Sequence, residues 1–205
     1  MSDPGVLIVF EGVNSVGKTT ISRLLAQQLN DNGNAAEWLS FPGNRPHSLG
    51  ALVYEVHHHP DKFGLKESTS LATQFLHIAA HLDAIESVII PTLQSGINVI
   101  LDRYWWSTLV YGPKDTKSQL ILEKAIAAEK MAWGDIVPEA LFLLTRNEPF
   151  DYSSRGNAWT TLQKNYLSLA EQEANHQNVF ILTNESSPAC TLSRVAEHLS
   201  HLRSR

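Results

Sequence analysis

The chain has 205 residues, of which 43% are apolar and 18% charged, and its formal net charge at pH 7 is −5. That length suits one domain with a substantial core, and the mild acidity argues against a nucleic-acid binder that works through broad electrostatics. No apolar run approaches the roughly 20 residues of a membrane span, and the first ten residues lack the basic flank of a signal peptide. The single cysteine, Cys190, cannot form an internal disulfide, which indicates a reducing, cytoplasmic compartment.

Short apolar, β-rich runs alternate with helical patterns along the chain. The expected strands are 6–10, 37–41, 97–101, 140–144 and 179–182, and the expected helices are 19–30, 49–58, 68–96, 117–133, 158–175 and 190–202. Nearly unbroken apolar runs of this length are typical of strands buried on both faces of a parallel sheet. Pro91 should kink or end the long helix 68–96. The alternation predicts a single α/β domain over 1–205, a doubly wound five-stranded parallel sheet flanked by helices.

A glycine-rich segment follows the first expected strand directly. It consists of Gly12, Val13, Asn14, Ser15, Val16, Gly17, Lys18, Thr19 and Thr20. It fits the pattern G-x-x-x-x-G-K-[ST] between a strand and a helix, in which backbone N–H groups curl around phosphate oxygens. We expect Lys18 to reach the β and γ phosphates of ATP and the Thr19 hydroxyl to bind Mg²⁺. The motif predicts binding of a nucleoside triphosphate and leaves the reaction open.

A second acidic position lies at the end of the third expected strand. Asp102 follows the apolar run 97–101 and precedes Arg103. In open α/β sheets this strand end borders the ligand site, and in phosphate-loop enzymes it often carries the Asp that holds Mg²⁺. Glu11 closes the first strand beside the same edge. It could contribute to the magnesium site or pair with Arg103, and the sequence leaves both open.

Together these segments resemble the thymidylate monophosphate kinase family. The resemblance is carried by LIVFEGVNSVGKTTISRLLAQQL at 7–29, FPGNR at 41–45, DRYWWSTLVYG at 102–112, PEALFLLT at 138–145 and LQKNYLSLA at 162–170. It covers most of the chain in the right order and spacing. It implies transfer of the γ-phosphoryl group of ATP to a nucleoside monophosphate, usually dTMP, with Mg²⁺, by a homodimer whose other partners are small nucleotides.

The resemblance also assigns roles to acceptor-side residues. It implies that Arg45 and Arg103 hold the acceptor phosphate and that Asp102 is an acidic partner near the metal. Acceptor-site positions are Phe41, Ser107, Thr108 and Tyr111, and Arg155 belongs to a short mobile lid around 146–157. Both reactants are anions, so Lys18, the arginines and Mg²⁺ are the groups expected to stabilise the transition state.

Four features depart from the family pattern. Asn14 stands where the family usually has an acid, the lid is short, and Gly112 replaces a Gln. On the long helix, His77 and His81 stand where the family has an aromatic residue and an Arg. We expect these two imidazoles to line the base pocket, with ordinary packing as the open alternative and a zinc site as a remoter one.

The sequence favours one function over two others. A nucleoside monophosphate kinase acting on dTMP explains the phosphate loop and two acceptor arginines together. A deoxynucleoside kinase would need a general base near an uncharged hydroxyl, and Glu11 is the obvious candidate. The unusual Asn14, His77 and His81 also permit a nucleotide-binding module that has lost acceptor recognition.

Overall fold

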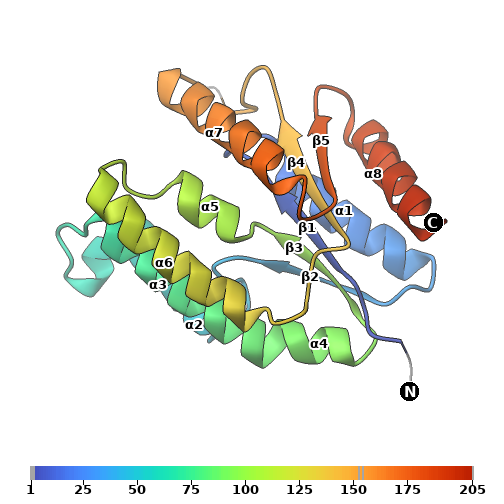
Figure 1. Cartoon of the computed structure of the whole chain (residues 1–205), viewed down its shortest axis with the longest axis horizontal. Coiled ribbons are helices and arrows are strands. Elements are labelled where there is room, and N and C mark those ends of the chain that lie inside the picture. Colours follow the sequence, from blue (N-terminus) through green and yellow to red (C-terminus); the bar gives the residue numbers. More distant parts are fainter. Residues whose placement is uncertain (1–2, 152, 154, 205) are drawn as a thin grey trace.

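A parallel sheet forms the centre of the computed structural model, which describes residues 3–151, 153 and 155–204 (Figure 1). Its strands are β1 Leu7–Glu11, β2 Ala36–Ser40, β3 Asn98–Asp102, β4 Ala140–Thr145 and β5 Val179–Thr183. They pair in the order β2-β3-β1-β4-β5, and every pair is parallel. β1 and β4 are buried along their whole length, as their apolar sequences require. The predicted five-stranded α/β fold is confirmed.

Helices cover both faces of this sheet (Figure 1). On one face lie α1 Lys18–Asp31 and α8 Pro188–Arg203. The other face carries α7 Asn157–Glu173, α5 Trp105–Val110, α6 Thr116–Ala132, α3 Ser70–Ala84 and α4 Ile90–Gln94, with α2 Leu49–His58 packed against α3. A 3-10 turn, η1 Pro60–Phe63, follows α2. This arrangement leaves the carboxyl ends of the strands at one edge, where ligands bind in open α/β sheets.

The long helix departs from its prediction in an informative way. Ahead of Pro91 the structure has a π-helical turn, η2 Ile85–Ile89, between α3 and α4, which the sequence pattern did not predict. Pro91 occupies the first turn of α4, and the helix continues beyond it to Gln94. A proline inside a helix cannot donate to the carbonyl one turn earlier, and the wider turn absorbs that mismatch. The short helices α5 and η1 were not predicted, because neither is long enough to show a period.

The continuous helical stretch Ser70–Gln94 is long and apolar enough, by length and composition alone, to cross a membrane. A core helix of a soluble protein passes the same test. Here α3 packs against α2 and α6, and α4 packs against β3. We therefore interpret Ser70–Gln94 as part of the helical layer that packs on the sheet.

The loop between β2 and α2 is held by a close approach of two backbones. A Cβ at Gly50 would lie 2.2 Å from the Pro42 carbonyl oxygen and 2.5 Å from the Gly43 Cα. Ser48 caps the helix by accepting a hydrogen bond of 3.1 Å from the Ala51 N–H. Only glycine allows α2 to start this close to the FPG segment, so the position of the loop depends on Gly50.

We expect Gly50→Ala to lower the free energy of unfolding by about 2 kcal/mol, because backbone must move to admit the methyl group. Val137→Ala, at a residue that is 61% exposed, is the control and should change it by less than about 0.5 kcal/mol. Denaturation in urea measures both. Equal stability of Gly50→Ala and the parent chain would contradict the close approach.

Candidate active site

The glycine-rich segment forms a phosphate-binding loop between β1 and α1. Gly12 (φ 138°) and Gly17 (φ 94°) have positive φ angles, and so does Ser15 (φ 63°). A Cβ at Gly12 would lie 2.3 Å from the Leu144 carbonyl oxygen, so the loop turns where only glycine fits. Val13 and Val16 are buried beneath it, whereas Thr20 is exposed on the first turn of α1. The loop thus has the compact turn and helix start that anion binding requires.

Lys18 is buried at the start of α1. Its Nζ donates a hydrogen bond of 2.9 Å to the Val13 carbonyl, and its residue surface is 5% exposed. Burial, and after it the charge of Arg103, lowers the pKa of the ammonium from 10.5 to about 7, against the opposing charges of Asp102 and Glu11. The folded protein therefore keeps a cation here at a cost, and an anionic ligand would relieve that cost.

Thr19 and Asp102 meet at the junction of α1 and β3. The Thr19 hydroxyl donates a hydrogen bond of 2.5 Å to Asp102 Oδ2. Asp102 Oδ1 is buried and has no hydrogen-bond partner among the described residues. Mg²⁺ prefers oxygen ligands, and this pair offers a hydroxyl oxygen together with a carboxylate oxygen that has no other partner. These two residues fit the predicted metal site.

Glu11, also predicted as a metal ligand, has a different task. Its Oε1 accepts the backbone N–H groups of Tyr104 (2.7 Å) and Ser107 (3.0 Å), and its Oε2 accepts the Ser107 hydroxyl (2.8 Å). Burial raises the pKa of its carboxyl, and the charge of Arg103 and the Ser107 hydrogen bond oppose that rise. We correct the assignment: Glu11 stabilises the first turn of α5 and balances the charge of Arg103, and its oxygens are already used by the chain.

Arg103 reaches the loop from the end of β3. Its backbone is left-handed (φ 80°), and its N–H donates to the Phe10 carbonyl at 2.9 Å. Nη1 donates to Ser107 Oγ at 2.9 Å, Nη2 donates to Asn14 Oδ1, and the guanidinium lies 5.7 Å from the Tyr111 ring centroid. Two cations, buried Lys18 and half-buried Arg103, therefore share the edge formed by β1 and β3.

Asn14 is bonded through its backbone as well as its side chain. Its N–H donates to the Tyr111 hydroxyl at 3.0 Å, and its carbonyl accepts the Trp159 indole N–H at 2.8 Å. Neither Trp159 nor Tyr166 on the same helix was predicted as a site residue. The sequence could have indicated Trp159 only through its chemistry, because a buried indole N–H usually donates a hydrogen bond to a nearby acceptor.

Two other predicted arginines pair locally. The Arg45 guanidinium contacts the Glu37 carboxylate, and its side chain is 47% exposed. Arg155 contacts Glu148 in the segment after β4. The structure therefore does not bring Arg45 to Lys18, and roles for both arginines toward an acceptor phosphate stay predictions. Residues 152 and 154 of the predicted lid lie outside the described residues.

The two histidines of α3 have separate environments. His81 is 2% exposed, its ring stacks on Phe41 at 4.0 Å and 12°, and its Nδ1 lies 3.1 Å from Glu129 Oε1. We correct its assignment to the base pocket: Phe41 covers it, and it packs in the core.

The second histidine of α3, His77, contacts α2: its Nε2 lies 3.0 Å from His57 Nδ1. Burial lowers the pKa of His77 to about 3, with help from His81, His57 and Arg103 in that order, so His77 is neutral and stays a base-pocket candidate.

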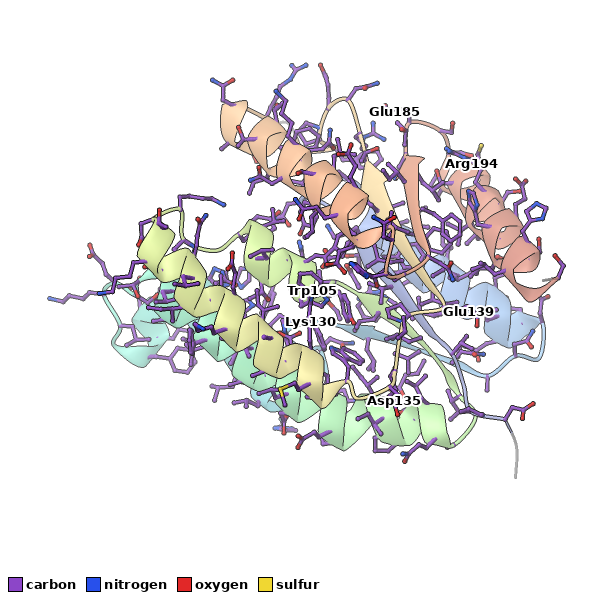
Figure 2. All side chains as sticks on the ribbon, in the orientation of Figure 1. Trp105, Lys130, Asp135, Glu139, Glu185 and Arg194 are labelled. Atoms are coloured by element: carbon purple, nitrogen blue, oxygen red, sulfur yellow. The ribbon has the colours of Figure 1, made fainter. Side chains whose placement is uncertain are left out.

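Residues of α5 line the interior of the site. Thr108 is buried, and its hydroxyl has no partner among the described residues, whereas the Ser107 hydroxyl is fully engaged. Trp105 and Trp106 are both buried. Lys130 of α6 covers the Trp105 ring, with Nζ 3.6 Å from its centroid (Figure 2). Gly112 lies where a Cβ would be 2.4 Å from Leu122 Cδ2, so a larger residue would require that side chain to shift.

A second group holds the loop from the β4 and β5 side. Buried Asn184 donates to the Val16 carbonyl at 2.7 Å and accepts the Thr191 hydroxyl at 2.7 Å. Arg146 pairs with Glu185 at 3.3 Å and lies 3.7 Å from the Phe150 ring centroid. Figure 2 shows Glu185 at the carboxyl edge of the sheet, at the opposite end from Glu139. No sequence motif indicated Asn184, whose role depends on a contact across 168 positions.

We expect Lys18→Met to stabilise the ligand-free protein at pH 6 by about 1–3 kcal/mol, because it removes a buried charge. The unfolded chain binds more protons than the folded one between pH 7 and the ordinary value of 10.5, so the parent gains stability as pH rises through that window and the difference shrinks.

Thermal unfolding in phosphate-free buffer at several pH values measures this difference. Lys62→Met, at a side chain that is 62% exposed, is the control and should show no such pH dependence. A Lys18→Met protein less stable than the parent at pH 6 would contradict the inference that the buried charge of Lys18 destabilises the folded protein.

Comparison with known proteins agrees with this geometry. The family model for thymidylate kinase matches residues 10–187. A thymidylate kinase of Bartonella quintana is 31% identical over 198 residues, covering 87% of this chain and 88% of that protein, and one of Chlorobium chlorochromatii is 25% identical over 91% and 90%. With several other relatives, such as that of Dinoroseobacter shibae (37% identical), the match spans about half of the relative's length.

The solved structure of thymidylate kinase from Ehrlichia chaffeensis superposes with a TM-score of 0.73. The two chains are 21% identical, and the match covers 96% of this chain and all of the other, which shows a shared fold. The family match extends over most of the chain, and the Bartonella relative is matched along most of its length. The resemblance noticed in the sequence is confirmed, and the chain belongs to the thymidylate kinase family.

Proposed function

We propose that the chain transfers the γ-phosphoryl group of ATP, with Mg²⁺, to the phosphate of a nucleoside monophosphate, dTMP, giving dTDP and ADP. The observation that carries this proposal is a pair of cations at one edge of the sheet, buried Lys18 and half-buried Arg103. Lys18 lies in the loop that takes the donor phosphates, and Arg103 comes from the adjoining strand. Two anionic reactants repel each other, and cations fixed in advance offset that repulsion.

The reaction needs positioning more than proton transfer. An oxygen of the acceptor phosphate forms a bond to the γ-phosphorus, the bond from that phosphorus to the β–γ bridging oxygen breaks, and ADP leaves with the electron pair. The acceptor is already an anion at pH 7, so no general base is required. Thr19 and Asp102 would hold Mg²⁺, which neutralises charge on the donor phosphates when bound. Arg45 and Arg155 would join only after leaving Glu37 and Glu148.

The alternative of a deoxynucleoside kinase loses its candidate base. Glu11 is fully buried, and both of its oxygens accept hydrogen bonds from the chain. A nucleoside hydroxyl would find no free carboxylate at that position. On the acceptor side, Arg103 fits a phosphate through two parallel hydrogen bonds.

A coupled assay of ADP release with dTMP, dUMP, dGMP, dCMP, dAMP and thymidine tests the proposal. We expect dTMP to be the best acceptor. Arg103→Lys should lower kcat/KM for dTMP about 100-fold because it removes the two-pronged contact. Arg23→Lys, on α1 with its guanidinium 4.1 Å from the Trp38 ring centroid, is the control and should match the parent.

Two outcomes would contradict the proposal. Faster turnover of thymidine than of dTMP would indicate a deoxynucleoside kinase. ATP binding in calorimetry without transfer to any monophosphate would indicate a nucleotide-binding module.

We further propose that the chain is a cytoplasmic homodimer joined through α2, α3 and α6. Exposed apolar side chains gather on these three packed helices: Leu49, Leu52, Phe75, Leu76, Leu120 and Ile121. A shared apolar surface of this kind favours association. The cytoplasmic location rests on the family and on the lone Cys190.

We expect Leu52→Glu to convert the dimer to a monomer in sedimentation equilibrium, because Leu52 is 50% exposed on α2. Val137→Glu makes the same chemical change at a residue that is 61% exposed between α6 and β4, and it should leave the dimer intact. A parent chain that sediments as a monomer would contradict this proposal alone.

A further inference from the structure

One face of α7 contacts both sides of the site. Trp159 and Tyr166 are seven residues apart, about two helical turns, so their side chains lie on the same face. Trp159 is 6% exposed and Tyr166 is fully buried. The Trp159 indole donates to the Asn14 carbonyl at 2.8 Å, and the Tyr166 hydroxyl lies 2.8 Å from Ser107 Oγ. The helix thus holds one residue of the phosphate loop and one residue of α5.

Those two residues are the ones that hold Arg103. Its Nη2 donates to the Asn14 side-chain oxygen, and its Nη1 donates to Ser107 Oγ at 2.9 Å. Each terminal nitrogen of the guanidinium is therefore bonded to a residue that α7 holds in turn. The Tyr111 ring lies beside the guanidinium and makes an edge contact with Tyr166 at 6.3 Å and 70°.

A free arginine side chain samples many rotamers, and ordering it costs free energy that would otherwise favour binding. We propose that α7 is a brace for Arg103, and that Trp159 and Tyr166 are positioning residues acting through Asn14 and Ser107. The inference rests on the proposed function only for the identity of the anion that Arg103 receives.

The first test needs no substrate. Exchange NMR measures rotation of the Arg103 guanidinium about its Nε–Cζ bond, with the signal assigned by its loss in Arg103→Lys. We expect Trp159→Phe and Tyr166→Phe each to speed this rotation several-fold, and the double variant to speed it more. Tyr166→Phe removes the hydroxyl and keeps the ring, whereas Trp159→Phe removes the indole N–H together with one of the two fused rings.

Trp38→Phe is the matched control. Trp38 also donates its indole N–H to a side-chain oxygen, Ser22 Oγ at 2.9 Å, between β2 and α1. It should leave Arg103 rotation unchanged, although it removes the same kind of hydrogen bond. Unchanged rotation in both Trp159→Phe and Tyr166→Phe, with their folds verified by thermal unfolding, would overturn the brace.

The second test compares dTMP with thymidine, which lacks the phosphate. Calorimetry should show that Trp159→Phe and Tyr166→Phe weaken dTMP binding about three- to tenfold, the loss expected from one hydrogen bond. Thymidine binding should stay the same. Equal weakening of both ligands would mean general loosening of the pocket and would overturn the inference. A parent chain that binds dTMP no better than thymidine would count against the proposed function, while the rotation measurement would still decide the brace.

Discussion

Burial of opposite charges at the carboxyl ends of β1 and β3 is the constraint on which the site depends. Lys18 is a buried cation and Arg103 a half-buried one, and Glu11 and Asp102 are the buried acidic groups whose charges oppose theirs. Charges removed from water remain ionised only when partners and hydrogen bonds offset the loss of solvation. Glu11 meets that demand with three hydrogen bonds from the start of α5, and Asp102 meets half of it with Thr19.

In the free protein, the charges of Lys18 and Asp102 are only partly compensated by the chain. The uncompensated part of each indicates the charge of the ligand that it would bind. Asp102 keeps one buried oxygen without a partner among the described residues, which suits a cation. Lys18 has a pKa lowered to about 7 by burial, which suits an anion. A magnesium nucleotide supplies both charges together. Binding energy would therefore come partly from the relief of strain that the fold already contains.

Much of this arrangement could be predicted from the sequence because its signals are local. The phosphate loop, the Asp102-Arg103 pair and the five apolar strands are contiguous patterns whose meaning follows from the residues beside them. The contacts that were missed join distant positions. Trp159 meets Asn14 across 145 positions, and His81 meets Glu129 across 48. Glu11 was misassigned because an acid at a strand end can serve a metal or a helix start, and only the third dimension separates the two.

The π-turn η2 has a consequence for comparing this chain with its relatives. Such a turn accommodates one residue more than the α-helical turn it replaces, so side chains before it are rotated by about 100° relative to an uninterrupted helix. His77 and His81 precede η2, whereas the landmark Asp102 follows it. Counting residues backwards from Asp102 without a gap can therefore match a residue that lines the nucleotide pocket in a relative with a residue on a different face of α3 in this chain. An alignment through 85–89 with a relative that lacks this turn should therefore be placed from the two structures, because the sequence pattern does not show the change in helical phase.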